Sequence, residues 1–385
     1  MIQFEFATAS RIIFGTGSLG SLETLVTEMG RRALVVMGGS GHRAAPVIEH
    51  LTFKSIGYST FNVVGEPTTD LVREGTMLAR REKCDFVIGI GGGSVIDAGK
   101  AIAALLTNGG DPLDYLEVIG KGQAITKAAA PYIAIPTTAG TGAEVTRNAV
   151  LGVPEHRVKV SLRSPLILPA VALVDPELTV TLPPPVTATT GLDALTQVIE
   201  PYVSHLANPL TDGFCLDGMH RAARSLREAY HNGEDLDARE DMSLASLQGG
   251  LALANAKLGA VHGFAGVFGG MFDSPHGGVC AALLPPVMEA NIRALLEREP
   301  DNEALYRYEE VAQILTGDPD ASVMDGVVWV EKLCQDLLIP GLGSYGLTEA
   351  DFPELVQKSG RSSSMKGNPI KLTDAELVEI LEKAM

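Results

Sequence analysis

Two pairs of polar residues have types and spacings that suit one metal or substrate site. Asp193 and Gln197 lie one helical turn apart within residues 191–200, so both side chains would project from the same face of a helix. His262 and His276 follow later in the chain, and each precedes a glycine that allows backbone to approach the imidazole closely. A carboxylate, an amide oxygen and two imidazoles can hold a divalent ion or, without an ion, bind a substrate directly.

The cysteines do not form a pattern typical of zinc ribbons or redox dithiols. Their spacings are unpaired, which predicts structural thiols in a reducing cytoplasm. The thiol of Cys280 follows His276 by four residues and could lie near the proposed site, but we expect it to serve as a small buried hydrophobic residue. The four are Cys84, Cys215, Cys280 and Cys334.

Two small-residue turns follow apolar, strand-like runs in the first half of the chain. Residues 91–100 follow the run Phe86–Ile90 and open a helix, so their backbone N–H groups and the helix dipole would face an anion. The turn fits neither standard dinucleotide fingerprint. Residues 136–144 follow the run 132–135 with threonines and glycines that suit a ribose, a diphosphate or a flat ring. Together the turns predict a nucleotide or phosphate site at the carboxyl ends of a parallel sheet.

The length of 385 residues and the change in pattern along the chain predict two domains. Residues 1–183 alternate strand-like and helical segments, which indicates an α/β Rossmann-like domain with a parallel sheet. Residues 184–385 show successive amphipathic helical segments, which indicates an all-α domain. The prolines at 183–185 mark the boundary, and helices are expected around 187–203, 209–230, 238–256 and 302–316.

Charge and hydropathy exclude some partners. The chain has 30 basic and 47 acidic residues, and its net charge of -17 argues against nucleic acid and anionic membranes as partners. No stretch reads as long and apolar enough to span a bilayer. Residues 1–7 resemble an alternating edge strand more than a signal peptide.

Five ordered motifs together resemble the iron-containing, or group III, alcohol dehydrogenase family. The resemblance implies a Rossmann-like domain followed by a helical metal domain, a plan shared with dehydroquinate synthases. It also implies NAD(P)-dependent interconversion of an alcohol with an aldehyde or ketone in the cleft between the domains. The motifs are Gly91–Ser94, Pro136–Gly142, Gly191–Thr196, Val261–Gly263 and Pro275–Gly277.

The same resemblance implies roles for individual residues toward the cofactor. It places the turn of residues 92–94 at the diphosphate and the threonines of the second turn at the nicotinamide. Lys159 would reach a ribose hydroxyl, although from its local sequence it could equally be a solvated strand residue. The residues so implied are Gly92, Gly93, Ser94, Asp97, Thr137, Thr138, Thr141 and Lys159.

The metal site departs from the family pattern of one aspartate and three histidines. Asp193, His262 and His276 are retained, but Gln197 stands where a histidine belongs, and Gly266 replaces a further nearby histidine. An amide oxygen is a poorer ligand than imidazole for iron or zinc, so weak or absent metal is expected. Bound metal would polarise the substrate oxygen. Without metal, Gln197 would donate a hydrogen bond to a carbonyl, and His262 or His276 would supply the proton.

The end of the first long apolar strand bears on the choice between NAD and NADP. No carboxylate follows the run 33–37, where NAD-binding domains usually present one to the ribose. Small residues and Arg43 would accommodate a 2'-phosphate, which slightly favours NADP, while Glu66 could oppose it. The residues expected here are Gly38, Gly39, Ser40 and Arg43.

The resulting prediction is a cytoplasmic NAD(P)-dependent oxidoreductase acting on a small alcohol or carbonyl compound. Three alternatives remain at this stage: a metal-independent carbonyl reductase, a lyase or cyclase of the dehydroquinate synthase type, and a nucleotide-binding protein without catalysis. Few basic residues lie around 191–200 and 255–280, which argues against a phosphorylated, carboxylated substrate. By family analogy we expect a homodimer or higher homo-oligomer, in which a strand at residues 2–7 can pair between subunits.

Overall fold

The computed structural model describes residues 3–39, 41–156 and 158–385. Its internal contacts divide it into two compact units. The α/β unit comprises residues 7–138 and 142–180, and the helical unit comprises residues 3–6, 139–141 and 181–385. Two short pieces of the N-terminal half therefore group with the helices.

The α/β unit is built on a six-stranded sheet in which every neighbouring pair is parallel. The strand order is β1-β8-β5-β4-β2-β3. The chain leaves β2 for the edge strand β3 and returns to the other side of β2 as β4, so the strand order reverses between β2 and β4. These strands are β1 (Arg11–Phe14), β2 (Arg32–Gly38), β3 (Gly57–Val63), β4 (Phe86–Gly91), β5 (Tyr132–Pro136) and β8 (Val171–Val174).

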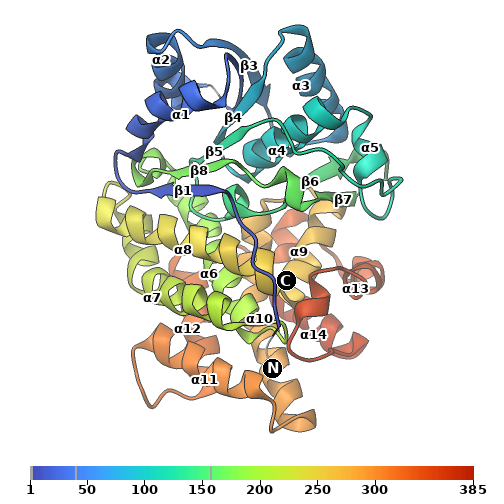
Figure 1. Cartoon of the computed structure of the whole chain (residues 1–385). Helices are drawn as coiled ribbons and strands as arrows, with labels where there is room; N and C mark the ends of the chain where they lie inside the picture. The colour runs from blue at the N-terminus through green and yellow to red at the C-terminus, as the bar shows by residue number, and fades with distance from the viewer. Residues whose placement is uncertain (1–2, 40, 157) are drawn as a thin grey trace. The chain divides into compact units, whose positions relative to one another are not determined.

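Helices cover both faces of this sheet, with α1 and α2 on one side and α3 and α4 on the other (Figure 1). Burial on both faces explains why the central strands read as continuous apolar runs rather than alternating ones: every residue of β4 and β5 is buried. The helices are α1 (Leu22–Met29), α2 (Ala45–Phe53), α3 (Thr69–Arg81), α4 (Gly93–Asn108) and the short α5 (Pro112–Tyr115).

A separate two-stranded antiparallel ribbon, β6 (Asn148–Val153) and β7 (Val158–Arg163), packs beside α4. Its alternating burial places Ala149, Leu151 and Val153 in the core shared with α3 and α4. No pattern in the sequence predicted this ribbon.

The helical unit packs around one large apolar core. Its first helix, α6, begins at Pro184, because proline lacks an N–H group that the first helical turn would leave unbonded. The four helices predicted from the sequence are confirmed within a few residues. The unit's helices are α6 (Pro184–Val203), α7 (Pro209–His231), α8 (Leu236–Ala256), α9 (Ala260–Met271), α10 (His276–Arg298), α11 (Glu303–Thr316), α12 (Val323–Asp336), α13 (Phe352–Ser359) and α14 (Asp374–Ala384).

Two expectations from the sequence need correction. Residues 3–9 form no strand in the single chain, and the first strand begins at Arg11. Helix α10 is long and apolar enough to cross a membrane by length and composition, contrary to the reading of the sequence. The structure buries 78% of that window inside the unit, and the hydropathy of α10 reflects its position in the core.

Candidate metal centre and cofactor site

The glycine and threonine turns predicted for the cofactor lie at one edge of the sheet. Gly38 ends β2, Gly91 ends β4, and Pro136 ends β5 directly opposite Gly91. Thr137 donates its backbone N–H to the carbonyl of Gly91 at 2.9 Å, which ties the two turns together. The reversal of strand order lies between β2 and β4, where open α/β sheets commonly bind ligands.

The remaining residues of the first turn open helix α4. Gly92 precedes the helix with extended backbone, and Gly93 and Ser94 form its first turn, so their free N–H groups point out of the helix start. A Cβ added at Gly92 would lie 3.4 Å from the Thr138 side chain, so the two turns are in close contact.

The other residues that the sequence assigned to the cofactor differ from one another in exposure and in their neighbours. Gly39 and Arg43 are exposed, with Arg43 in a short 3-10 turn after β2. Ser40 lies outside the described residues. Thr141 belongs to the segment 139–141 that groups with the helical unit. Lys159 on β7 pairs with Glu66 at 3.2 Å.

Both carboxylate oxygens of Asp97 contact groups of the α/β unit. One carboxylate oxygen accepts the backbone N–H of Val150 at 3.0 Å, and the other lies 3.0 Å from the ammonium group of Lys100. Burial raises the pKa of Asp97, and Lys100 and the Val150 amide oppose that rise. The geometry gives Asp97 a structural link between α4 and the β6–β7 ribbon, a role that sequence reasoning missed.

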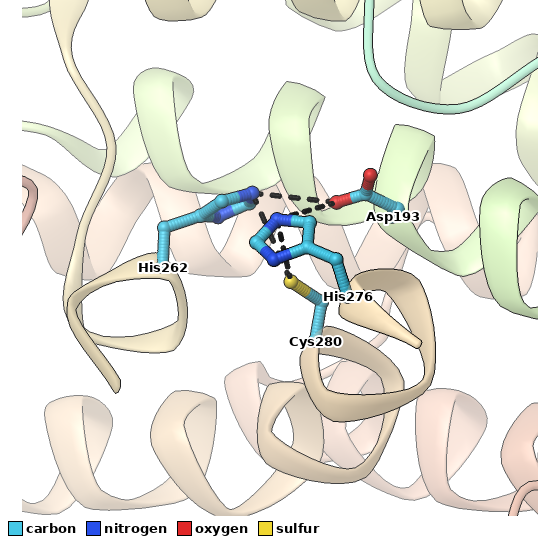
Figure 2. A group of neighbouring side chains, drawn as sticks. All are labelled: Asp193, His262, His276 and Cys280. Carbon is cyan, nitrogen blue, oxygen red and sulfur yellow. Dashed lines mark hydrogen bonds and ion pairs between the residues drawn. The ribbon is translucent and has the colours of Figure 1, made fainter. Parts of the chain in front are cut away.

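In the helical unit, three helices bring metal-binding side chains to one point (Figure 2). Helix α6 supplies Asp193, α9 supplies His262 and α10 supplies both His276 and Cys280. One ligand atom from each of the four residues lies within 4.8 Å of the others. The structure thus groups Asp193 with both histidines, as predicted, and adds a thiol.

The separations are close to those of a metal site. Asp193 Oδ1 lies 3.3 Å from His262 Nε2 and 4.0 Å from His276 Nε2. Cys280 Sγ lies 3.8 Å from His262 Nε2 and 3.6 Å from His276 Nε2. Tetrahedral zinc at its usual bond lengths separates nitrogen and oxygen ligands by roughly 3.4 Å and nitrogen and sulfur ligands by about 3.6 Å.

Glu200 orients His262. One oxygen of Glu200 lies 2.7 Å from His262 Nδ1, and the other accepts the backbone N–H of Val261 at 2.7 Å. With its proton on Nδ1 held by Glu200, a neutral His262 presents the Nε2 lone pair to the cluster. Metal-binding histidines commonly have such a carboxylate partner. The sequence contained a signal for Glu200, because it lies seven residues after Asp193 and therefore on the same helical face.

Close helix packing at Gly277 makes the cluster possible. A Cβ at this position would come within 2.4 Å of the Thr189 carbonyl oxygen on α6 and 3.4 Å of the Asp193 Cβ. Only glycine allows the first turn of α10, with His276, to lie this close to α6. The glycines flanking the histidines therefore serve close approach, as the sequence indicated.

The ionisable side chains of this four-residue cluster favour the binding of a proton or another cation. Burial opposes protonation of His262, but Cys280, Asp193 and Glu200 outweigh it and raise the pKa of His262 well above its usual value. Burial likewise opposes protonation of His276, and Cys280 and Asp193 raise its pKa. Burial alone would raise the pKa of Asp193, but the histidines and the Gln197 amide lower it. Either a proton or a metal cation would neutralise the negative charge of the cluster.

Gln197 Oε1, beside the cluster, is a buried oxygen that makes no hydrogen bond within the described part of the chain, whereas Asp193 Oδ1 has the His262 imidazole at 3.3 Å. Gln197 is buried beside α8, where a Cβ at Gly249 would lie 3.5 Å from Gln197 Oε1. Gly266, one turn after His262 on α9, has open space where a side chain would project.

Comparison with known proteins identifies the family. Residues 9–176 match the iron-containing alcohol dehydrogenase family, and residues 187–385 match the C-terminal domain of Fe-containing alcohol dehydrogenases. The chain belongs to the iron-containing alcohol dehydrogenase family. It is an oxidoreductase of the alcohol dehydrogenase type, and the family typically uses NAD(P) and iron.

Individual relatives cover nearly the whole chain. The 1,3-propanediol dehydrogenase of Citrobacter freundii is 36% identical over 372 residues, covering 95% of this chain and 92% of the relative. The NAD-dependent methanol dehydrogenase of Bacillus methanolicus is 32% identical and covers 100% of both chains. The crystal structure of a 1,3-propanediol oxidoreductase matches with a TM-score of 0.92 and 32% identity, covering 100% of both chains.

These findings confirm the predicted two-part fold and the predicted class of reaction. They favour a dehydrogenase over a lyase or cyclase.

Proposed function

We propose that this protein is a divalent-metal-dependent, NAD(P)-linked dehydrogenase for small alcohols, with Asp193, His262 and His276 as metal ligands. One observation carries the proposal. His262 Nε2 faces Asp193 Oδ1 at 3.3 Å while Glu200 holds its Nδ1 at 2.7 Å, and the ligand atoms of His262, Asp193, His276 and Cys280 all lie within 4.8 Å of one another. A buried set of one carboxylate, two imidazoles and one thiol needs positive charge, either as protons on the imidazoles or as a bound cation, and its ligand types and separations fit a divalent metal.

The chain's own residues would position the substrate and handle the proton. A bound divalent ion supplies Lewis-acid polarisation of the substrate oxygen, which favours hydride exchange with the nicotinamide. His276 has 35% of its side chain exposed, the most of any residue in the cluster, so it is the best placed to meet a substrate. Asp193 and Glu200 would keep both imidazoles oriented during turnover.

A metal-independent carbonyl reductase is the second candidate. In that mechanism Gln197 would donate a hydrogen bond to the substrate carbonyl. Its side chain is only 2% exposed, and its amide already acts on Asp193 as a hydrogen-bond donor, which favours the metal-dependent mechanism.

For the cofactor we propose NADPH over NADH by a modest margin. Gly38 and Gly39 provide no carboxylate at the end of β2, and Arg43 is exposed one turn further on. Glu66, which could repel a 2'-phosphate, has its charge partly balanced by Lys159 at 3.2 Å. One relative is named as NAD-dependent, so the kcat/KM values for NADPH and NADH should be compared directly. Arg43→Ala should lower the value for NADPH and leave that for NADH unchanged.

The substrate class proposed is a short primary alcohol or diol and the corresponding aldehyde. Relatives named for propanediol and methanol act on small alcohols, and others are named for choline and for long-chain alcohols, so the substrate panel should include all of these classes. We also propose a cytoplasmic homo-oligomer. Four free cysteines suit a reducing compartment, and Phe4, in a segment without strand pairing, has 46% of its surface exposed. Light scattering on the purified protein would give its mass in solution.

The test of the proposed function combines metal analysis with a substrate panel. Protein purified without chelator should contain about one divalent ion per chain. It should oxidise NAD(P)H with short aldehydes and lose activity on chelation, with recovery on adding Fe(II) or Zn(II). Activity unaffected by chelator would overturn the metal mechanism in favour of the carbonyl reductase. Cofactor binding without activity across the panel would indicate a nucleotide-binding protein.

A further inference from the structure

We propose that Cys280 is the fourth protein ligand of the metal site, in place of the helical imidazole that Gln197 does not provide. The proposal rests on the metal site of the proposed function and extends it. It assigns an Asp193, His262, His276 and Cys280 ligand set, in which a thiolate accompanies one carboxylate and two imidazoles.

The first support is geometric. Cys280 Sγ lies 3.6 and 3.8 Å from the Nε2 atoms of His276 and His262. Nitrogen and sulfur ligands around tetrahedral zinc are about 3.6 Å apart, so the sulfur occupies a ligand position without further movement of the helix. Figure 2 shows the thiol and both imidazoles directed toward the same point.

The second support is the helix that carries the sulfur. His276 and Cys280 are separated by four residues on α10, so both project from one face and move together. Asp193 and Gln197 have the same spacing on α6. In the family pattern, α6 supplies two ligands at positions 193 and 197. In this chain α10 offers two candidate ligands with the same spacing, His276 and Cys280.

The third support is the orientation of Gln197. Its amide acts on Asp193 as a hydrogen-bond donor, and its Oε1 lies beside Gly249 of α8. This arrangement makes Gln197 a partner of a ligand, whereas Cys280 and the buried Asp193 Oδ1 both lie within the group of four candidate ligands.

The ligand type determines which metal is favoured. Thiolate ligands favour zinc and other softer ions over metals that prefer oxygen. We therefore expect the site to select Zn(II) over Fe(II). On binding, the Cys280 thiol releases its proton to solvent, and the thiolate pairs with the cation.

The test uses the full-length protein, Zn(II) and Co(II) as probes, and Cys215→Ala as the matched control. Cys215 is a fully buried thiol in the core of the same unit, so its loss matches the change in packing. Co(II)-loaded wild type and Cys215→Ala should show a thiolate-to-cobalt charge-transfer band in the near ultraviolet. Zinc-edge absorption should show a sulfur shell at about 2.3 Å.

In Cys280→Ala the band and the sulfur shell should disappear, and Zn(II) affinity should fall by more than about 100-fold, since the loss of an outer partner alone costs 10- to 100-fold. Cys280→Ala/Gln197→His should regain Zn(II) affinity without the band.

The outcomes separate this inference from the proposed function. Tight Zn(II) binding without a sulfur signal, or unchanged affinity in Cys280→Ala, would overturn the role of Cys280 and leave the metal site in place. No binding of either metal to the wild type would overturn both.

Discussion

Each unit of this protein contains a buried polar cluster, and the two clusters differ in the kind of positive charge that faces the buried carboxylate. In the α/β unit, the Lys100 ammonium donates to the Ala143 carbonyl at 2.8 Å and to the Thr146 hydroxyl at 2.9 Å, and pairs with Asp97 at 3.0 Å. In the helical unit, a carboxylate, two imidazoles and a thiol from three helices face one another, and the charged neighbour of Asp193 Oδ1 is the titratable imidazole of His262 at 3.3 Å.

The difference separates structure from function. A buried charge whose partners are all supplied by the chain stabilises the fold. A buried carboxylate that faces titratable imidazoles and a thiol can instead be neutralised by a metal cation that these groups bind. By this criterion we interpret the contacts of Asp97 as structural and propose Asp193 as a metal ligand; the sequence had assigned both residues to function.

The largest effect should follow from Asp193→Asn. Loss of the charged ligand should release the metal and remove several kcal/mol of transition-state stabilisation, lowering kcat/KM at least about 10³-fold. Metal content and kcat/KM are the measurements, with the exposed Asp301→Asn as the control. Full metal content in Asp193→Asn would show that Asp193 is not a metal ligand, and the two clusters would then not differ in function.

Lys100→Met should destabilise the α/β unit and leave the metal content unchanged. The substitution removes the hydrogen bonds of Lys100 to Ala143, Thr146 and Asn148 and leaves Asp97 buried without its cation, which should cost about 3–4 kcal/mol of unfolding free energy. Urea unfolding of the variant and of Lys127→Met, an exposed lysine, would measure the difference. Wild-type stability together with loss of cofactor binding would show that this cluster is functional.

Glu144→Gln should change how stability depends on pH. Burial raises the pKa of Glu144 from 4.5 to about 7. The folded chain therefore binds the proton more tightly than the unfolded chain, and this group lowers stability as the pH rises from 4.5 to 7. The loss amounts to about 3 kcal/mol above that range. Glutamine carries no titrating charge, so the variant should gain about that much relative to wild type between roughly pH 4 and pH 8. A pH-independent difference in unfolding free energy would contradict this cause.

The smallest of these effects is expected for Glu200→Gln. Its amide would present an N–H group to His262 Nδ1, which favours the tautomer protonated on Nε2 and blocks the lone pair needed for metal. Metal affinity should fall about 10- to 100-fold. Competition with a chelator would measure it, beside the exposed Glu309→Gln. Equal affinities in the two variants would show that Glu200 only anchors α9.

The sequence was most informative where function depends on backbone. Apolar runs ending in glycine or threonine located the ends of β4 and β5, and with them the turns at Gly91 and Thr137, because local chain properties determine both. The prolines before residue 186 likewise fixed the start of α6. Asp193, His262 and His276 were grouped through the family resemblance, and the structure brings them together.

The other features of the fold and the site depend on tertiary packing, which residue spacing alone does not specify. The closeness of Cys280 to both imidazoles arises from the approach of α10 to α6 at Gly277, which no local pattern determines. The thiol's spacing of four residues from His276 was a usable signal, but burial of a small residue explained it equally well. The β6–β7 ribbon and the fixation of Asp97 by Lys100 likewise need tertiary contacts.

Glu200 has two roles, and together they limit which substitutions position 200 can accept. The same carboxylate bonds the start of α9 through Val261 and sets the tautomer of His262. A shift of α9 by one residue, or a shorter acidic side chain at position 200, would alter the helix start and the ligand together. We therefore expect a substitution at position 200 to affect both, whereas Gln197 and Cys280 lie inside α6 and α10 and can be exchanged without altering a helix start.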